Sequence, residues 1–268
     1  MIKLFITDLD GTLLGMNHSL KQKDITAVQS LDEKGIDFGV ASGRMDHEIL
    51  EVLKKVEVGA HRVSQNGAFL YDRDDQHIHS QTFEGPLAKR ILDVIEEEPL
   101  IKTVSTADST YTAKHSKWID LISEQLFHDI IVEPSLRDHV GTKIHASKIS
   151  LNGTEHEITE AYERIHSSLQ GDVDIFISHE SCVDIMPKAI NKGTGIQALL
   201  DTLDVNPEEI VCIGDSFNDL SMFELTPHSY AMSGAHPKVK EKANHVVDHV
   251  YEAIEDIEKK MKDECSTF

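Results

Sequence analysis

The chain opens with "MIKLFITDLDGTLL", residues 1–14, and this stretch sets the interpretation of the rest. Ile2 to Thr7 form a short apolar run without alternation, which predicts a strand buried on both faces of a parallel sheet. Asp8 and Asp10 follow at once. If strand geometry continues past Thr7, both carboxylates point to the same side. Because like charges repel each other, we expect a cation or a chemical task to account for this pair.

Strands and helices alternate on both sides of the middle of the chain. Ile36–Ala41 and Ile210–Gly214 are two further short apolar runs, and amphipathic helical patterns separate such runs. This alternation predicts an α/β fold with a Rossmann-like, doubly wound parallel sheet. In such sheets ligands bind just beyond the carboxyl ends of the strands. The polar residues that follow the three runs, Asp8, Ser42 and Asp215, are therefore expected at one edge.

The middle segment has a different texture. It contains its own helical patterns and alternating strand patterns, with enough length for a small core of its own. We therefore predict a discontinuous core domain, residues 1–82 and 184–268, interrupted by an inserted α+β domain at residues 83–183.

Three carboxylates and a lysine at the predicted edge indicate a metal and a phosphoryl group. Asp8, Asp10 and Asp215 are hard oxygen donors of like charge, and Mg²⁺ prefers a few carboxylates together with water and substrate phosphate. Lys192 adds a compact positive charge at the start of a predicted helix. Neutral donors are available from Ser42, the Gly43 amide and the Asn218 amide. Such a set stabilises the oxygens of a transferring phosphoryl group.

Four segments carry a family resemblance, and they occur in the family's order. "DLDGTLL" (8–14), "ASGR" (41–44), "NKGTG" (191–195) and "GDSFNDLSMF" (214–223) resemble the four motifs of the haloacid dehalogenase superfamily of phosphohydrolases. The tract "QNGAFLYD" (65–72) and the long insert resemble the Cof-type branch, which carries an α/β cap of type IIB. The resemblance spans nearly the whole chain.

The resemblance implies a role for each matching residue. Asp8 would be the nucleophile that forms an aspartyl-phosphate, and Asp10 the general acid and base. Mg²⁺ would be held by the Asp8 side chain, the Asp10 backbone carbonyl and Asp215. Phosphate would contact the Leu9 amide, Ser42, Gly43, Lys192 and Asn218.

Four other positions have less definite roles. Asp219 is expected to support the metal through water, and Asn66 is a candidate substrate or supporting residue. Two roles stay open for Arg44: contact with the leaving group, or an ion pair with an acidic side chain on the surface. Lys188 is a second candidate for the lysine of the third motif. We prefer Lys192, because a glycine and a helix start follow it.

The function implied is a magnesium-dependent phosphatase for a small phosphorylated metabolite. A sugar phosphate is the substrate expected by resemblance, while a flavin or pyridoxal phosphate stays open. A phosphomutase of the same superfamily is an alternative, although the three arginines of the insert are spread out. A catalytically silent sugar-phosphate sensor is a second alternative, but a sensor would have no need of Asp10 as an acid.

Composition excludes several classes of partner. The chain has 26 Lys and Arg against 47 Asp and Glu, a net charge of −21, which disfavours nucleic acid and anionic membranes. No apolar run approaches a membrane span. The three cysteines form neither a disulfide framework nor a metal knuckle, which is typical of a reducing compartment. We expect a cytoplasmic protein, and a monomer because no additional dimerisation element is visible.

Overall fold

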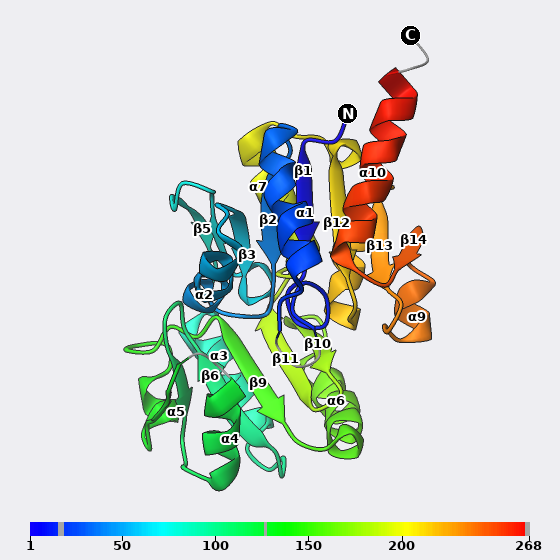
Figure 1. Ribbon diagram of the computed structural model, residues 1–268. Helices are drawn as coiled ribbons and strands as arrows, with labels where there is room; N and C mark the ends of the chain where they lie inside the picture. The colour runs from blue at the N-terminus through cyan, green and yellow to red at the C-terminus, as the bar shows by residue number, and fades with distance from the viewer. Residues whose placement is uncertain (16–18, 126–127, 266–268) are drawn as a thin grey trace. The chain divides into compact units, whose positions relative to one another are not determined.

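The computed structural model describes residues 1–15, 19–125 and 128–265 of the chain (Figure 1). Contacts between Cα atoms divide it into two compact units. The core unit contains Met1–Arg44, Ile49–His79 and Lys192–Phe268, and the inserted unit contains Met45–Glu48 and Ser80–Asn191. Among the helices described, we find none with both the length and the apolar character that crossing a bilayer requires.

The core unit is built on an eight-stranded sheet. Its strands, in spatial order, are β14 (His245–Val247), β13 (Ser229–Met232), β12 (Ile210–Gly214), β1 (Leu4–Thr7), β2 (Asp37–Ala41), β3 (His61–Ser64), β4 (Phe69–Tyr71) and β5 (His77–Ser80). The strands from β14 to β3 are parallel, and β4 runs antiparallel to β3. The predicted parallel sheet is therefore confirmed, with an antiparallel addition at one edge.

Helices cover both faces of this sheet, because its central strand is apolar on both. Side chains alternate along β1: Phe5 joins one apolar cluster, while Leu4 and Ile6 join another. The first cluster includes residues of α1 (Gln22–Glu33), α2 (Asp46–Val56) and α10 (Val250–Cys265), and the second includes residues of α7 (Lys192–Leu203), α8 (Leu220–Phe223) and α9 (Pro237–Lys240). The doubly wound α/β fold predicted from the alternating pattern is confirmed.

The inserted unit has a separate sheet and a separate core. The sheet contains, in spatial order, β10 (Val173–His179), β11 (Cys182–Pro187), β9 (Lys148–Asn152), β6 (Ile101–Ser105), β7 (Thr110–Thr112) and β8 (Ile130–Val132). Only the β7–β8 pair is parallel among these described strands. The helices of the unit are α3 (Gly85–Val94), α4 (Lys117–Gln125), α5 (Leu136–His139) and α6 (Glu155–Leu169).

The core of the inserted unit combines residues of the sheet with residues of α3, α5 and α6. Ile91 of α3 and Ile158 of α6 pack with Val104, Ile149 and other apolar residues of the sheet. The α+β character predicted for the insert is confirmed. Strand β11 pairs with β9 from Cys182 to Ile185. The inserted unit, as defined by contacts between Cα atoms, extends to Asn191.

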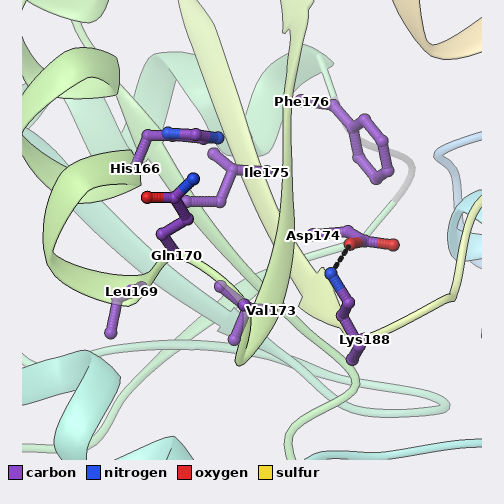
Figure 2. A pocket seen from close by; sticks show the side chains of 9 residues that line it. His166, Leu169, Gln170, Val173, Asp174, Ile175, Phe176 and Lys188 are labelled. Carbon is purple, nitrogen blue, oxygen red and sulfur yellow. Dashed lines mark ion pairs between the residues drawn. The ribbon is translucent and has the colours of Figure 1, made fainter.

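A pocket of about 390 Å³ lies in the inserted unit, where α6 ends and β10 begins. Figure 2 shows Phe176 and the ion pair between Asp174 and Lys188 in its wall. The Nζ atom of Lys188 lies 3.4 Å from Asp174 Oδ1, and 58% of the lysine side chain is exposed. Lys188 thus forms an ordinary surface ion pair within the inserted unit.

A buried histidine in β3 makes the stability of the core unit depend on pH. His61 is buried, neither ring nitrogen has a hydrogen-bond partner among the described residues, and Asp37 Oδ2 lies 3.7 Å from Nε2. Burial lowers the pKa of His61, and Asp37 opposes this only in part. The unfolded chain therefore binds a proton at a higher pH than the folded chain. The folded state therefore loses stability as the pH falls below about 6.5, the pKa of histidine in the unfolded chain.

We expect the His61→Leu variant to lose part of this dependence. The urea midpoint of the wild type should decrease when the pH is lowered from about 7.5 to about 5.5. The decrease should be smaller in the variant. Equal decreases in the two proteins would show that His61 is not a source of the acid sensitivity.

Candidate active site

The carboxyl ends of three neighbouring strands bring the predicted residues together. Strand β1 lies between β2 and β12, and Thr7 pairs with Val40 on one side and Ile213 on the other. The backbone N–H of Asp8 donates to Ile213 O at 2.8 Å. Asp8, Ser42 and Asp215 follow these strand ends, so they share one edge of the sheet, where the alternating pattern had placed them.

Lys192 joins this edge from the first residue of α7. Its Nζ atom donates to Asp8 Oδ1 and to Asp219 Oδ1, both at 2.6 Å. Only 1% of the lysine side chain is exposed, and the side chains of Asp8 and Asp219 are 7% and 0% exposed. An ammonium group between two buried carboxylates compensates charges that would otherwise be costly to bury.

Asp219 organises the loop that follows β12. It is fully buried, and its Oδ2 atom accepts the backbone N–H groups of Asp215 and Ser216, each at 2.8 Å. Its Oδ1 atom accepts from Lys192. Gly214 makes this arrangement possible, because a Cβ atom there would lie 2.4 Å from Asp219 Cγ. Both oxygens of Asp219 are therefore engaged by donors from the chain itself.

The pKa values of this cluster reflect burial and crowding of like charges. Burial raises the pKa of Asp8 well above its usual value, against the pull of Lys192 and with help from Asp219. Burial and the Asp219 carboxylate raise the pKa of Asp215 to about 6. Burial alone would lower the pKa of Lys192, but Asp219 and Asp8 outweigh it, so the pKa is raised. A further cation would favour the ionised form of both Asp8 and Asp215.

The donors at this edge fit a divalent cation. Carboxylate oxygens of Asp8, Asp215 and Asp219 lie within 4.8 Å of one another. Since both oxygens of Asp219 already accept hydrogen bonds, Asp8 and Asp215 are the better ligands. Among these six described side chains, the four carboxylates outnumber the two cations Lys192 and Arg44, a formal excess of two negative charges. Oxygen donors with that excess match Mg²⁺.

Asp10 is held differently from the other three aspartates. Arg44 Nε donates to Asp10 Oδ2 at 2.7 Å, and Arg44 Nη2 donates to Asp10 Oδ1 at 2.8 Å. The Arg44 side chain is 9% exposed and the Asp10 side chain 43%. Of the two roles left open for Arg44, the structure shows an ion pair with an acid, and that acid is Asp10. The paired carboxylate is oriented by two parallel hydrogen bonds, a geometry that lysine cannot supply.

The neutral donors predicted around the site come from three segments. Ser42 is buried at the end of β2, and the N–H of Arg44 donates to its Oγ atom at 3.2 Å. Leu9 sends its side chain into the core, as expected for the residue between Asp8 and Asp10. The side-chain amide of Asn218 donates from Nδ2 to Asn66 Oδ1 at 3.1 Å.

Two supporting residues were not identified from the sequence. Thr12 Oγ1 donates to Asp215 Oδ1 at 3.2 Å, across a separation of 203 residues. Ser221 Oγ accepts from the N–H of Gly193 at 3.0 Å and therefore connects the α7 start with the loop after β12. Both residues lie inside motif segments, but a hydroxyl that orients another side chain leaves no spacing signal in a single sequence.

A family model for haloacid dehalogenase-like hydrolases matches residues 5–255 of the chain. The chain belongs to this family. The membership predicted from the four motifs is thus confirmed, and the two sheets agree with the capped architecture expected for the Cof-type branch.

Individual relatives align over most of their length. A Haemophilus influenzae protein is 29% identical over 246 residues, covering 91% of this chain and 92% of the relative. Phosphatase YwpJ of Bacillus subtilis is 24% identical over 268 residues, covering 91% and 94%. The crystal structure of TM0651 from Thermotoga maritima superimposes with a TM-score of 0.82 at 30% identity, covering 96% and 97%.

Gly11 offers a test of the carboxylate geometry in this haloacid dehalogenase-like hydrolase. Its φ is +83°, and a Cβ atom there would lie 2.3 Å from Asp215 Oδ2. We expect Gly11→Ala to displace Asp215 and to lower the phosphatase rate, measured with added Mg²⁺, about a hundredfold, since misplacement by about 1 Å has such an effect. The Mg²⁺ concentration for half-maximal rate should rise as well.

Gly35→Ala is the matched control for Gly11→Ala. Gly35 has a φ of +67°, but no atom lies within 4 Å of the position of its Cβ. Both variants strain the backbone, whereas only one reaches a carboxylate. Equal losses of rate in the two variants would mean that backbone strain, not displacement of Asp215, is responsible.

Proposed function

We propose that the protein is a magnesium-dependent phosphatase that hydrolyses a small phosphorylated metabolite through an aspartyl-phosphate. The observation that carries this proposal is the buried ammonium of Lys192, 2.6 Å from Asp8 and from Asp219, beside a third carboxylate, Asp215. A nucleophile, a fixed cation and ligands for a divalent metal then lie at one edge. Phosphoryl transfer depends on this combination of positioning and charge stabilisation.

Asp8 and Asp10 divide the chemistry between them. A carboxylate oxygen of Asp8 attacks phosphorus and forms the O–P bond, while the bond from phosphorus to the leaving oxygen breaks. Asp10 gives its proton to that oxygen and later accepts one from the water that hydrolyses the aspartyl-phosphate. Arg44 orients Asp10 through two hydrogen bonds, and we expect this pair to loosen when Asp10 takes up a proton.

The remaining residues hold the phosphoryl group and the metal. The Asp8 side chain, the Asp10 backbone carbonyl and Asp215 would hold Mg²⁺, and Asp219 would support it through water. When bound, Mg²⁺ would neutralise part of the charge on the phosphoryl oxygens. The groups that would contact phosphate are the Leu9 amide, Ser42, Gly43, Lys192 and Asn218.

The names of two relatives support phosphate chemistry. One aligned relative is named Phosphatase YwpJ, and another, from Citrobacter koseri, is named HMP-PP phosphatase and is 23% identical over 258 residues, covering 89% of this chain and 87% of the relative. We propose a sugar phosphate as the substrate. Because one relative is named HMP-PP phosphatase, the test also includes pyrophosphates.

The arginines of the inserted unit favour hydrolysis over a phosphomutase reaction. A mutase needs cations for a second phosphate, yet each of these arginines already pairs with an acid of the same unit. The pairs are Arg90 with Asp172 at 2.6 Å, Arg137 with Asp93 at 2.6 Å, and Arg164 with Glu98 at 2.8 Å. A silent sensor is disfavoured because the Asp10 carboxylate, oriented by Arg44, has no use in binding alone.

The proposal is tested by turnover of p-nitrophenyl phosphate with Mg²⁺, with the same assay in EDTA as control. We expect turnover that depends on the metal, followed by selectivity for one class in a panel of sugar phosphates, flavin and pyridoxal phosphates, and pyrophosphates. Binding of a sugar phosphate without any turnover would favour the sensor, and transfer of phosphate to a second sugar would favour the mutase.

A further inference from the structure

A buried turn of unusual backbone geometry lies beside the candidate site. It is the 3-10 turn η1 (Gln65–Gly67), which connects β3 with β4. All three residues have positive φ, +46° for Gln65, +55° for Asn66 and +104° for Gly67. Gln65 and Asn66 are both buried, so contact with solvent does not account for this conformation. Strain of this kind persists only where surrounding contacts enforce it, and it often accompanies functional sites.

The backbone of this turn holds the segment after β2. The N–H of Gln65 donates to Arg44 O at 2.8 Å, and the N–H of Asn66 donates to Ser42 O at 2.9 Å. These two bonds span the Ser42–Gly43–Arg44 segment, which contains two of the proposed phosphate contacts. The left-handed conformation turns both amides toward that segment, so the strain has a structural use.

The side chain of Asn66 reaches the loop after β12 as well. Asn66 Oδ1 accepts from Asn218 Nδ2 at 3.1 Å, across a separation of 152 residues. Asn66 also lies against Gly43, since a Cβ atom on Gly43 would be 3.4 Å from Asn66 Oδ1. One side chain therefore contacts both segments that supply neutral phosphate donors.

Asn218 depends on this contact for the orientation of its amide. The side chain is 9% exposed, and its Oδ1 atom has no hydrogen-bond partner within the described ranges. The hydrogen bond to Asn66 Oδ1 therefore fixes the positions of Nδ2 and Oδ1 in the Asn218 side chain. Without it, the amide could rotate by half a turn and present oxygen where a phosphate needs N–H.

We infer that Asn66 is a positioning residue: it fixes the Asn218 amide and its spacing from Ser42 and Gly43, and so sets the affinity of the site for phosphate. This inference rests on the proposed function. Asn66 needs no contact with the substrate to act in this way, because it works through Asn218.

Asn66→Gly tests the inference while keeping the turn. Glycine adopts positive φ without strain and retains the N–H that donates to Ser42, so only the side-chain amide is removed. Glu57→Gly is the matched control: Glu57 also has positive φ, at 59°, is exposed, and lies outside the site. Binding of inorganic phosphate is measured by calorimetry in the presence of Mg²⁺, together with thermal unfolding and the kinetic constants for p-nitrophenyl phosphate.

We expect Asn66→Gly to weaken phosphate binding about tenfold, the loss of one oriented hydrogen bond to a charged group, with KM raised and the unfolding temperature not lowered. Glu57→Gly should bind phosphate like the wild type. In an Asn218→Ala background, Asn66→Gly should have little further effect, because residues that act through one contact are not additive.

Several outcomes would overturn the inference. One is unchanged phosphate binding in Asn66→Gly, and another is additive losses of phosphate affinity in the double variant. A third is a lower kcat with unchanged phosphate binding, together with a lower unfolding temperature. Phosphate binding separates this test from the test of function. A wild type that binds phosphate but shows no turnover would refute the phosphatase while the comparison of variants still decides the role of Asn66. A wild type that does not bind phosphate would refute both.

Discussion

Asp8→Asn should abolish turnover of phosphomonoesters while leaving the fold intact. The amide is nearly isosteric with the carboxylate but is a poor nucleophile, so the aspartyl-phosphate cannot form. We expect a loss of at least about a thousandfold in kcat, equal to about 4 kcal/mol of barrier. The measurement is steady-state turnover of p-nitrophenyl phosphate with Mg²⁺. Mass spectrometry of quenched wild-type enzyme should place the phosphoryl group on the peptide that contains Asp8.

Asp24→Asn provides the control for Asp8→Asn. Asp24 is a buried aspartate of α1 that accepts the N–H of Tyr251 at 2.9 Å, so its replacement removes a carboxylate of similar burial outside the proposed machinery. Activity should remain close to that of the wild type. If Asp8→Asn kept comparable activity, or if the phosphoryl group appeared on another residue, the assignment of the nucleophile would be wrong.

Lys192→Met should lower both activity and stability, and the loss of stability should depend on the metal. Removing the ammonium leaves Asp8 and Asp219 buried without their shared partner, which typically costs about 3–5 kcal/mol. A divalent cation at Asp8 and Asp215 would offset part of that charge. We therefore expect a large drop of the urea midpoint in EDTA and a smaller drop in Mg²⁺, with turnover reduced by at least about a hundredfold.

Lys188→Met is the matched control, because Lys188 is the other lysine that the sequence offered for this role. Its ion pair with Asp174 is exposed, and such pairs contribute about 1 kcal/mol or less. The variant should keep its activity and show no dependence of stability on Mg²⁺ beyond that of the wild type. A Lys192→Met protein destabilised equally in EDTA and Mg²⁺ would speak against a cation beside Asp8.

Much of the core could be predicted because its signals are local. An apolar run such as Ile2–Thr7 has few alternatives to a buried parallel strand, and the observed strand, Leu4–Thr7, is shorter only at its beginning. Strand ends in a parallel sheet share an edge, so Asp8, Ser42 and Asp215 could be expected to meet. The choice of Lys192 over Lys188 also followed from local features, the glycine after it and the start of a helix.

The contacts between side chains of the site could not be predicted in the same way. Three hydrogen-bonded pairs each join residues from separate segments. They are Arg44 with Asp10, Thr12 with Asp215, and Asn218 with Asn66. Their partners depend on the register of strands and on the path of loops. An Asn-Gly pair such as Asn66-Gly67 indicates a turn, but nothing in it reveals which distant side chain the asparagine will hold.

The position of β1 has a consequence for how the protein is made. Leu4 pairs with Asp37 on one side and with Ile210 on the other, so the ribosome releases one neighbour of this strand long before the other. Contacts between such distant segments form late, since a long loop must close first. A chain that ends before Lys192 would carry Asp8, Ser42 and the pair of Arg44 with Asp10, but it would lack Lys192, Asp215 and Asp219. Under the proposed function, a chain without those three residues would be inactive.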